Sequence, residues 1–294
     1  MTTMVLDIGG TAIKSGLYTD GKLTEIREIP TEAKQGGPHV VERAKELIAD
    51  YRQRHPFQRI GISTAGQVDP VRGRILYANA NIPNYTNTPL KDIMEQEFQV
   101  PTAVENDVNA AAIGEAAFGA GREHSDFVCL TYGTGVGGAI FTDGKLFSGS
   151  SFSAGEFGAM VTHPEQRNAG QDLFSGCYEK YASTTALVND ARKLDPALSN
   201  GRLIFQRMEE PPVRQLVDRW IIEIVNGLTT IVHMLNPSCI LLGGGVMEQS
   251  YVTEQIRETL YRNIMPSFRH VKVQKTELGN RAGMLGAAVL EQGR

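Results

Sequence analysis

The chain has 294 residues, of which 41% are hydrophobic, so it is long enough for two domains or one large domain with a substantial core. Its net charge of −4 at pH 7 argues against a nucleic-acid-binding surface, which would need a basic stripe. Its three cysteines are too few and too scattered for a disulfide framework, and they fit a reducing cytoplasm.

The N-terminus shows no targeting signal, because residues 1–6 form a short run without a basic start. The stretch worth testing as a membrane span is 224–247, which contains no Asp, Glu, Lys or Arg. It also contains a proline, two asparagines and three consecutive glycines, which favour a buried helix, a turn and a buried strand. We therefore expect a soluble cytoplasmic protein with neither a membrane nor a nucleic acid as partner.

An apolar strand near the N-terminus opens into the turn DIGGT at residues 7–11, and the chain returns as a second strand toward the hairpin signal DG at 20–21. Gly9 and Gly10 allow backbone N–H groups to approach an anion closely, and Thr11 adds a hydroxyl. The turn is consistent with a phosphate site, but two-glycine turns are also common in ordinary hairpins.

An internal repeat strengthens this interpretation. Residues 10–23 align without a gap on residues 133–146, with identical residues at both ends and matched apolar residues between them. Each copy follows an apolar strand, so the repeat predicts a duplicated domain in which each copy carries a glycine turn and a hairpin. Two such turns facing each other across a cleft would hold a polyphosphate from both sides. Chance similarity between two β-hairpins is the alternative.

Helical and strand-like segments alternate between the two copies. Apolar residues between 40 and 51 follow helical spacing, and 59–63 is a strand that leaves as a loop over 64–66. The irregular polar stretch 79–85 suits a hydroxylated ligand, although turn chemistry alone also favours Asn and Pro. This alternation indicates an α/β protein with mixed sheets.

The sequence ENDVN at 105–109 lies between a strand-like run, 100–104, and an alanine-rich helix, 110–120. Asp107 is therefore expected where a strand ends and a helix begins. A helix-starting role is one explanation, because Asp satisfies free backbone N–H groups there. The other is a general base at the carboxyl end of a strand, where open α/β sheets bind ligands. The glycine-rich turns on both sides of it in the chain favour the base.

Two carboxylates follow the second copy: Glu156 in a glycine-flanked turn and Glu179 just before a helix. The remaining elements are a long helix over 216–235, a strand over 237–242 that ends in three glycines open to a nucleotide, and a helix over 282–290 that packs on small residues.

Five motifs in order, DIGGT, ENDVN, GTGVGG (133–138), GEFG (155–158) and LGGG (242–245), make the chain resemble ROK-family sugar kinases over nearly its whole length. That family has the actin-like ATPase (ribonuclease H-like) fold: two α/β domains with mixed sheets around a central cleft, with the final helix returning to the first domain. The resemblance implies a small domain of residues 1–114 plus 281–294 and a large domain of residues 115–280.

The activity implied by the resemblance is phosphorylation of a sugar hydroxyl, commonly the 6-hydroxyl, by ATP with Mg²⁺ that enters with the nucleotide. Family habit also implies a homodimer. Carried over by position, Asp107 is the catalytic base. The nucleotide-binding positions are Asp7, Gly9, Gly10, Thr11 and Lys14 in the first phosphate motif, Gly133, Thr134, Gly135 and Gly137 in the second, and Gly244 and Gly245 on the adenosine side. The sugar-binding positions are Gly66, Asn81, Asn106, Asp107, Glu156 and Glu179, and Tyr85 stands where the family often has Trp.

One departure from the family pattern concerns zinc. Many members carry a His after the Glu156 position and then a cysteine-rich run, and these residues bind zinc. Here those positions hold Ala159, Gly170 and Asp172, so only Cys177 remains. One thiol and the nearby His163 do not make a tetrahedral site, so we expect no structural zinc.

The missing His also bears on the substrate, because in the zinc-bearing members it touches the sugar near the anomeric carbon. The β-glucoside kinase type also lacks it, which favours β-glucosides such as cellobiose; glucokinase and N-acetylmannosamine kinase are the alternatives. The family also includes transcriptional repressors, but these need a helix-turn-helix domain and only six residues precede Asp7. A catalytically inactive sugar-binding protein is a further alternative. The intact Asp107 and the two intact phosphate motifs argue against it.

Overall fold

Two five-stranded sheets of matching strand order organise the chain in this computed structural model, which describes residues 1–290. Contacts divide the chain into unit 1, residues 1–123, 145–154 and 277–290, and unit 2, residues 124–144 and 155–276. The mixed sheets confirm the predicted α/β class. The predicted domain limits at residues 114 and 280 stay a prediction, and residues 291–294 lie outside the described part of the chain.

The sheet of unit 1 has the order β3-β2-β1-β4-β7. Its strands are β1 (Thr2–Ile8), β2 (Ala12–Thr19), β3 (Lys22–Pro30), β4 (Arg59–Thr64) and β7 (Thr102–Asn106). β1 pairs antiparallel with β2 and parallel with β4, and β4 pairs parallel with β7. Since parallel strands end at the same edge, the carboxyl ends of β1, β4 and β7 meet there. A separate pair, β5 (Gln67–Asp69) and β6 (Arg74–Tyr77), follows β4.

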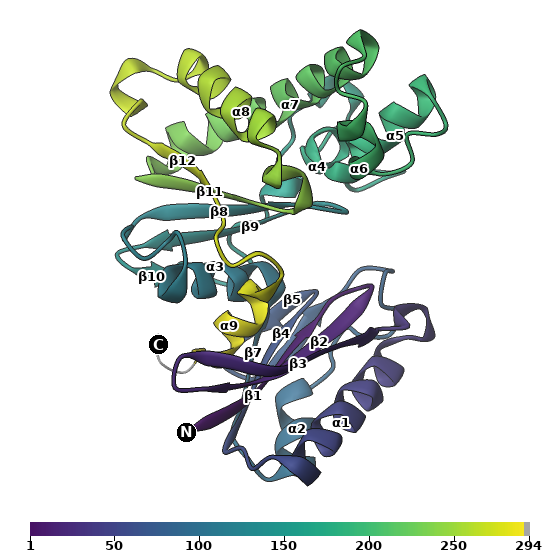
Figure 1. The fold of residues 1–294 in the computed structure, drawn as a ribbon, viewed down its shortest axis with the longest axis vertical. Helices are drawn as coiled ribbons and strands as arrows, with labels where there is room; N and C mark the ends of the chain where they lie inside the picture. The colour runs from purple at the N-terminus through teal and green to yellow at the C-terminus, as the bar shows by residue number, and fades with distance from the viewer. Residues whose placement is uncertain (291–294) are drawn as a thin grey trace. The chain divides into compact units, whose positions relative to one another are not determined.

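Alternation along β1 separates the two faces of this sheet. Met4, Leu6 and Ile8 belong to a core that includes α1 (Gly37–Arg54) and α2 (Leu90–Phe98). Val5 belongs to another cluster with residues of α9 (Ala282–Ala288), and α3 (Asp107–Phe118) packs on α9 (Figure 1). The buried face of α1 is the one predicted from its spacing: Val40, Val41, Ala44, Leu47, Ile48 and Tyr51.

Glycines allow the backbones of α3 and α9 to cross at very short range. A Cβ added to Gly286 would lie 1.7 Å from the carbonyl oxygen of Ala110, and one added to Gly114 would lie 2.5 Å from that of Ala282. On the sheet side, a Cβ at Gly61 would lie 2.1 Å from the carbonyl oxygen of Ala287. The predicted C-terminal helix on small residues, returning to the first unit, is therefore confirmed, and it depends on side chains being absent.

A buried carboxylate fastens the end of α3 to the segment that leads into α9. Glu115 accepts the backbone N–H groups of Ala120 at 2.9 Å, Glu277 at 3.1 Å and Leu278 at 2.9 Å. Hydrogen bonds to a charged group are stronger than those between neutral groups. Residue 277 is where the chain re-enters unit 1, so Glu115 fixes the start of that final segment.

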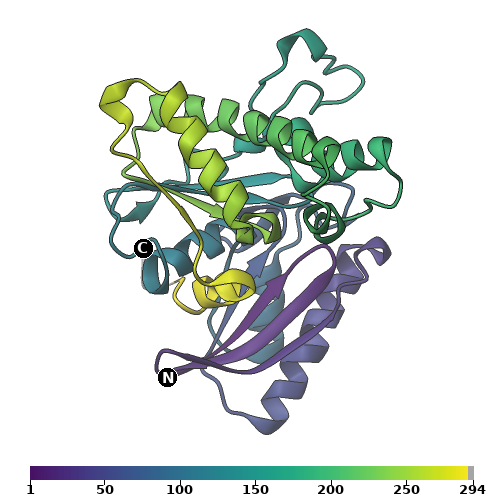
Figure 2. The same ribbon diagram turned by 45° about the horizontal axis from the view of Figure 1, so that its top comes forward.

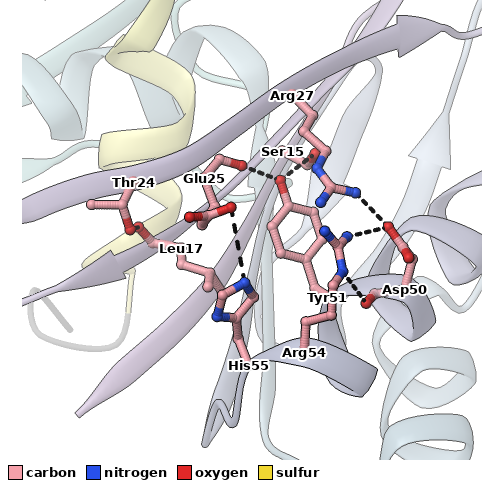
Figure 3. A network of polar contacts seen from close by, with 9 residues as sticks. All are labelled: Ser15, Leu17, Thr24, Glu25, Arg27, Asp50, Tyr51, Arg54 and His55. Atoms are coloured by element: carbon pink, nitrogen blue, oxygen red, sulfur yellow. Dashed lines mark hydrogen bonds and ion pairs between the residues drawn. The ribbon is translucent and has the colours of Figure 1, made fainter.

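The β2–β3 hairpin is tied to α1 through Tyr51 (Figure 3). The Tyr51 hydroxyl donates to the carbonyl oxygen of Glu25 and lies 3.2 Å from Ser15 Oγ, and burial raises its pKa. The Arg27 guanidinium lies 4.7 Å from the Tyr51 ring centroid and, like Arg54, pairs with Asp50. The pairing of β2 with β3 shifts register beside Ser15, so these contacts hold the irregular part of the hairpin against α1.

Unit 2 repeats the arrangement in a sheet of order β10-β9-β8-β11-β12. Its strands within unit 2 are β8 (Phe127–Tyr132), β9 (Val136–Thr142), β11 (Cys239–Gly243) and β12 (Lys272–Lys275), and the short edge strand β10 (Lys145–Leu146) comes from the segment 145–154 counted with unit 1. The helices are α4 (Glu179–Ala182), α5 (Thr184–Leu194), α6 (Gly201–Gln206), α7 (Pro211–Leu235) and α8 (Ser250–Asn263), with α7 and α8 lying over the sheet (Figures 1 and 2). α7 begins five residues before its predicted start, because Pro211 and Pro212 suit a first turn that needs no N–H.

The two repeated hairpins match in their outer turns and differ by one residue at their glycine turns. Asp20-Gly21 and Asp143-Gly144 all have positive φ, as the tight turn of a two-residue hairpin requires. In the first copy Ile8 pairs with Ile13, whereas in the second Tyr132 pairs with Val136. The second turn is thus one residue shorter, a difference that the ungapped sequence alignment does not reveal.

No helix in the described residues is long and apolar enough to span a membrane.

Replacing Gly286 by Ala should lower the free energy of unfolding by about 3 kcal/mol. The methyl group would overlap the backbone of α3, and overpacking of this kind outweighs the gain of up to ~1 kcal/mol in helix propensity. Urea denaturation measures the change. Gly170→Ala is the control, because the nearest atom to its added Cβ is 3.9 Å away; equal stability of the two variants would contradict the close crossing.

Candidate functional site

Asp107 is the first residue of α3 and directly follows β7, where the sequence placed it. The residue that caps the helix is its neighbour, Asn106, whose side chain accepts the N–H groups of Val108 and Asn109. Asp107 Oδ1 also accepts the Val108 N–H at 2.9 Å, and the Asn106 amide at 3.0 Å. The capping role considered for Asp107 thus belongs largely to Asn106.

The Asn106 side chain uses its whole hydrogen-bonding capacity inside unit 1. Its Nδ2 donates to the carbonyl oxygen of Gly66 at 2.9 Å and to Asp107 at 3.0 Å, and its Oδ1 accepts two N–H groups at 3.0 and 3.1 Å. An amide has two donors and two acceptor lone pairs, so a bond to a sugar would have to share or replace one of these. The geometry gives Asn106 a clear role in orienting Asp107; its contact with sugar stays a prediction.

Burial and, to a smaller extent, the negative charge of Asp7 raise the pKa of the Asp107 carboxyl to about 7. The hydrogen bonds from Val108 and Asn106 act in the opposite direction, because they stabilise the ionised form. The loss of hydration is the largest of these effects. A carboxylate with this pKa takes up a proton readily near neutral pH, as a general base must.

Asp7 lies near the end of β1, opposite Lys14 on β2 and Ser63 on β4. Ser63 Oγ donates to Asp7 Oδ1 at 2.7 Å, and Lys14 Nζ lies 3.4 Å from Asp7 Oδ2. A Cβ at Gly283 of α9 would lie 2.8 Å from Asp7 Oδ1, so that glycine makes room for the carboxylate. Neither Ser63 nor Gly283 was predicted as a site residue, and the only sequence signal for Ser63 is that it ends the predicted strand 59–63.

The first glycine turn is open on its outer side. Gly9 donates its N–H to the Ala12 carbonyl oxygen at 3.0 Å, and its own carbonyl accepts Thr31 Oγ1 at 2.7 Å. Gly10 and Thr11 are exposed, and a Cβ at Gly10 would meet no atom within 4 Å. The turn is thus held from behind and presents free surface in front, as an anion site requires.

Of the predicted sugar positions in unit 1, Gly66, Asn106 and Asp107 come together through the hydrogen bonds described above. Gly66 has a φ of +100°, and a Cβ there would lie 2.8 Å from the Tyr77 carbonyl oxygen. Asn81 lies on an exposed loop, and its N–H bonds to Asn79 Oδ1 at 3.0 Å. Tyr85 is fully buried, with its hydroxyl 2.9 Å from Thr64 Oγ1, so it supports this loop from the core.

In unit 2, Glu179 lies against the second glycine turn. A Cβ at Gly135 would lie 2.5 Å from Glu179 Oε2, and the Val136 N–H bonds to the Glu179 carboxylate. Burial raises the pKa of Glu179, and the negative charge of Glu156 raises it by a smaller amount. Glu156 itself is exposed, just before the 3₁₀ turn η2 (Phe157–Ala159). The structure therefore joins a predicted sugar residue, Glu179, to a predicted phosphate motif.

A cavity of about 860 Å³ in unit 2 brings the second phosphate motif and the adenosine-side turn together. Gly133, Thr134 and Gly245 line it, whereas Gly135, Gly137 and Gly244 are not among its lining residues. Gly244 has a φ of +107°, and a Cβ there would lie 2.3 Å from the Tyr132 carbonyl oxygen. The cavity is within the size range of small-molecule sites, about 300–1,000 Å³.

Several residues of this cavity were not predicted from the sequence: Thr184, Thr185, Val188, Asn189 and Arg192 of α5, and Asn200, Arg202, Phe205 and Gln206 at α6. Thr184 Oγ1 donates to the Tyr132 carbonyl oxygen at 2.9 Å, and Arg192 Nη2 to that of Ser199 at 3.1 Å. The described lining includes two arginines and neither Asp nor Glu, so its charge suits an anion. No sequence pattern links α5 and α6 to the glycine turns.

The residues at the family's zinc positions do not fit a zinc ion in this structure. Ala159 and Gly170 provide no ligand, and Asp172 pairs with Lys180 at 2.8 Å. Cys177 Sγ lies 3.3 Å from Arg167 Nη1, and a cation beside the thiol opposes a second cation there. Among the described residues, no group of three or more His, Cys, Asp or Glu side chains could hold a metal ion.

Comparison with known proteins decides the family. The ROK family model matches residues 3–294. The chain belongs to the ROK family. This ROK protein is 38% identical over 291 residues to an uncharacterized protein of Clostridium perfringens, covering 96% of this chain and 95% of that one. It is 31% identical to a β-glucoside kinase of Klebsiella pneumoniae, with 98% of this chain and 95% of the relative covered.

Among solved structures, a ROK glucokinase of Streptomyces griseus in complex with glucose and AMPPNP matches this ROK protein with a TM-score of 0.85. The two are 31% identical, and the match covers 99% of each chain. Together with the family model, this match confirms the actin-like ATPase fold that the sequence motifs implied.

The raised pKa of Asp107 should appear in the pH dependence of stability. The folded chain binds this proton more tightly than the unfolded chain, so the stabilisation is complete at low pH and is lost as the pH rises through about 7. Asp107→Asn removes the titration. Its free energy of unfolding, relative to wild type, should therefore increase by up to about 3 kcal/mol between pH 5 and pH 8 in urea titrations. If the free energies of unfolding of the two proteins changed in parallel with pH, the pKa of Asp107 in the folded chain would be an ordinary one.

Proposed function

We propose that this chain is an ATP-dependent sugar kinase that transfers the γ-phosphoryl group to a sugar hydroxyl, with Asp107 as the general base. The observation that carries the proposal is the partly desolvated Asp107 carboxylate at the meeting point of β7 and α3, with a pKa raised to about 7. The family membership and the relatives named as sugar kinases support it.

In the proposed reaction, the Asp107 carboxylate accepts the proton of the attacking hydroxyl as the sugar oxygen bonds to the γ-phosphorus. The bond to the ADP oxygen breaks at the same centre. Because phosphoryl transfer depends mainly on positioning and charge stabilisation, a base and phosphate-binding turns are sufficient protein groups. Asn106 orients the base. Within unit 1 the proposed phosphate contacts are Gly9, Gly10, Thr11 and Lys14, and within unit 2 the proposed nucleotide site is the cavity described above.

The Asp7 carboxylate offers the hard oxygen ligands that Mg²⁺ prefers and is held by a hydrogen bond from Ser63, but the Lys14 ammonium beside Asp7 Oδ2 opposes a second cation at that oxygen. The expected Mg²⁺ therefore stays a prediction. The ion enters with ATP and, when bound, neutralises phosphate charge. A homodimer in the cytoplasm stays a prediction from the family resemblance.

Asp107→Asn should lower kcat by about 10²–10⁴-fold while leaving ATP affinity nearly unchanged, since the amide keeps the size of the side chain but cannot accept the proton. In the wild type, kcat/KM should fall as the pH drops below about 7, because only the ionised carboxylate is a base. A coupled ADP-release assay and calorimetric ATP titration measure the two quantities.

The matched control is Asp92→Asn, which replaces an exposed carboxylate in the first turn of α2. It should leave both kcat and ATP affinity at wild-type values. Near-normal turnover by the Asp107 variant would show that another group takes the proton.

For the substrate, we propose a β-glucoside such as cellobiose, phosphorylated on the 6-hydroxyl of the non-reducing ring. Ala159 is exposed at the end of η2, three residues after Glu156, and carries only a methyl group. An imidazole at this position would add both bulk and a hydrogen-bonding partner for an anomeric hydroxyl. Its absence leaves room for an aglycone. Glucose and N-acetylmannosamine are the alternative acceptors.

The kcat/KM for cellobiose and for an aryl β-glucoside should be at least equal to that for glucose or N-acetylmannosamine. Polar partners of a substrate hydroxyl discriminate strongly, so their loss should relax selection for a free anomeric hydroxyl. Ala159→His is the matched variant and should shift preference toward glucose. Strong activity on a free monosaccharide with none on either glucoside would defeat the substrate assignment and leave the kinase assignment standing.

A further inference from the structure

The segment between Val161 and Cys177 forms a closed loop on unit 2. An antiparallel bridge joins Val161 to Cys177, and the N–H groups of Thr162 and His163 both bond to the Gly176 carbonyl oxygen at 3.0 Å. At its base the His163 ring stacks on Tyr181, with ring centroids 3.7 Å apart. The loop is mostly exposed and buries few apolar groups, so its shape depends on polar contacts.

One cation lies at the centre of those contacts. Arg167 Nη1 lies 2.5 Å from the Leu173 carbonyl oxygen, 2.8 Å from that of Ser175 and 3.3 Å from Cys177 Sγ. The Asn168 N–H adds a bond to Ser175 Oγ at 2.7 Å. A guanidinium is always charged and can serve several acceptors at once, so one side chain joins the outgoing and returning halves of the loop.

This loop contains three of the four zinc positions discussed above, Gly170, Asp172 and Cys177, and only Cys177 keeps the family's ligand. A zinc ion cross-links a loop by binding several side chains at one positive centre. Arg167 also offers one positive centre, but it binds two backbone carbonyls together with the remaining thiol. Because Arg167 donates to backbone carbonyl oxygens, the loop keeps a cross-link without cysteines at positions 170 and 172.

Glu179 follows Cys177 by two residues. The Tyr178 N–H bonds to the Met160 carbonyl oxygen at 2.7 Å, which places the chain on both sides of the bridge in register. The Glu179 carboxylate then reaches Gly135 and Val136 of the glycine turn. The end of the loop is therefore also the start of the element that carries Glu179.

We propose that Arg167 is a positioning residue that replaces the zinc of other ROK proteins as the cross-link of the 161–177 loop and so fixes Glu179 for sugar binding. The effect on sugar binding rests on the proposed kinase function. The cross-link itself does not, and it can be tested on the protein without any substrate.

The test compares Arg167→Ala, Arg167→Lys and the control Arg262→Ala, which removes an exposed arginine from α8. Limited proteolysis with mapping of the cut sites should show cleavage within 161–177 accelerated about tenfold or more in Arg167→Ala, because hydrogen bonds to a charged group are lost. Arg167→Lys should be intermediate, since an ammonium cannot reproduce the fork of a guanidinium. The control should match wild type.

A second measurement separates positioning from general destabilisation. In Arg167→Ala the KM for sugar should rise about tenfold, while the KM for ATP changes less than about twofold, because the cavity of unit 2 does not include this loop. Wild-type protein should keep its Tm in a chelator and contain no stoichiometric zinc.

Cleavage of 161–177 at the wild-type rate in both Arg167 variants would overturn the proposal, as would about one zinc per chain with a Tm lowered by the chelator. If Arg167→Ala fails to fold, Arg167→Lys decides by the same cleavage rate. If no sugar is phosphorylated, the kinase assignment fails, and the proteolysis result still decides whether Arg167 is the cross-link.

Discussion

The constraint on which unit 1 depends is that the Asp107 carboxylate must lose much of its hydration and still be held in one orientation. Loss of water raises its pKa, and bonds from Asn106 and Val108 limit that rise. The strand β7 delivers the residue to the edge of the sheet, and the glycine contacts between α3 and α9 fix the helix that begins with it. Backbone packing about one and two helical turns from the carboxylate thus helps to position it.

Much of this arrangement could be predicted from the sequence, because the signals are local. The spacing of apolar residues identified the buried face of α1, and DG dipeptides located both hairpin turns. The junction between strand and helix at Asp107 was predicted from a strand-like run that is followed by an alanine-rich run. By contrast, the capping role of Asn106 was missed, since both Asn and Asp start helices well and only the hydrogen bonds distinguish them.

What the sequence could not provide are contacts between distant segments. Ser63 reaches Asp7 only because β1 and β4 pair in one register, and α5 and α6 meet the second glycine turn only in the folded unit. Gly135 has the same limitation: as a residue of a glycine-rich motif it suggests a phosphate, but its neighbour here is the carboxylate of Glu179. A motif identifies the residue type that is required and leaves its partner undetermined.

The discontinuity of unit 1 has a consequence for how the chain is made. Val5 and Glu115 are synthesised early, but their partners in α9 and at residues 277–278 come last. At 5–20 residues per second, the intervening stretch of about 150 residues takes roughly 8 to 30 s. During that time the first sheet has one apolar face uncovered and a carboxylate without two of its N–H partners. A premature stop codon before residue 277 would therefore damage unit 1, although the ribosome has by then already made most of its residues.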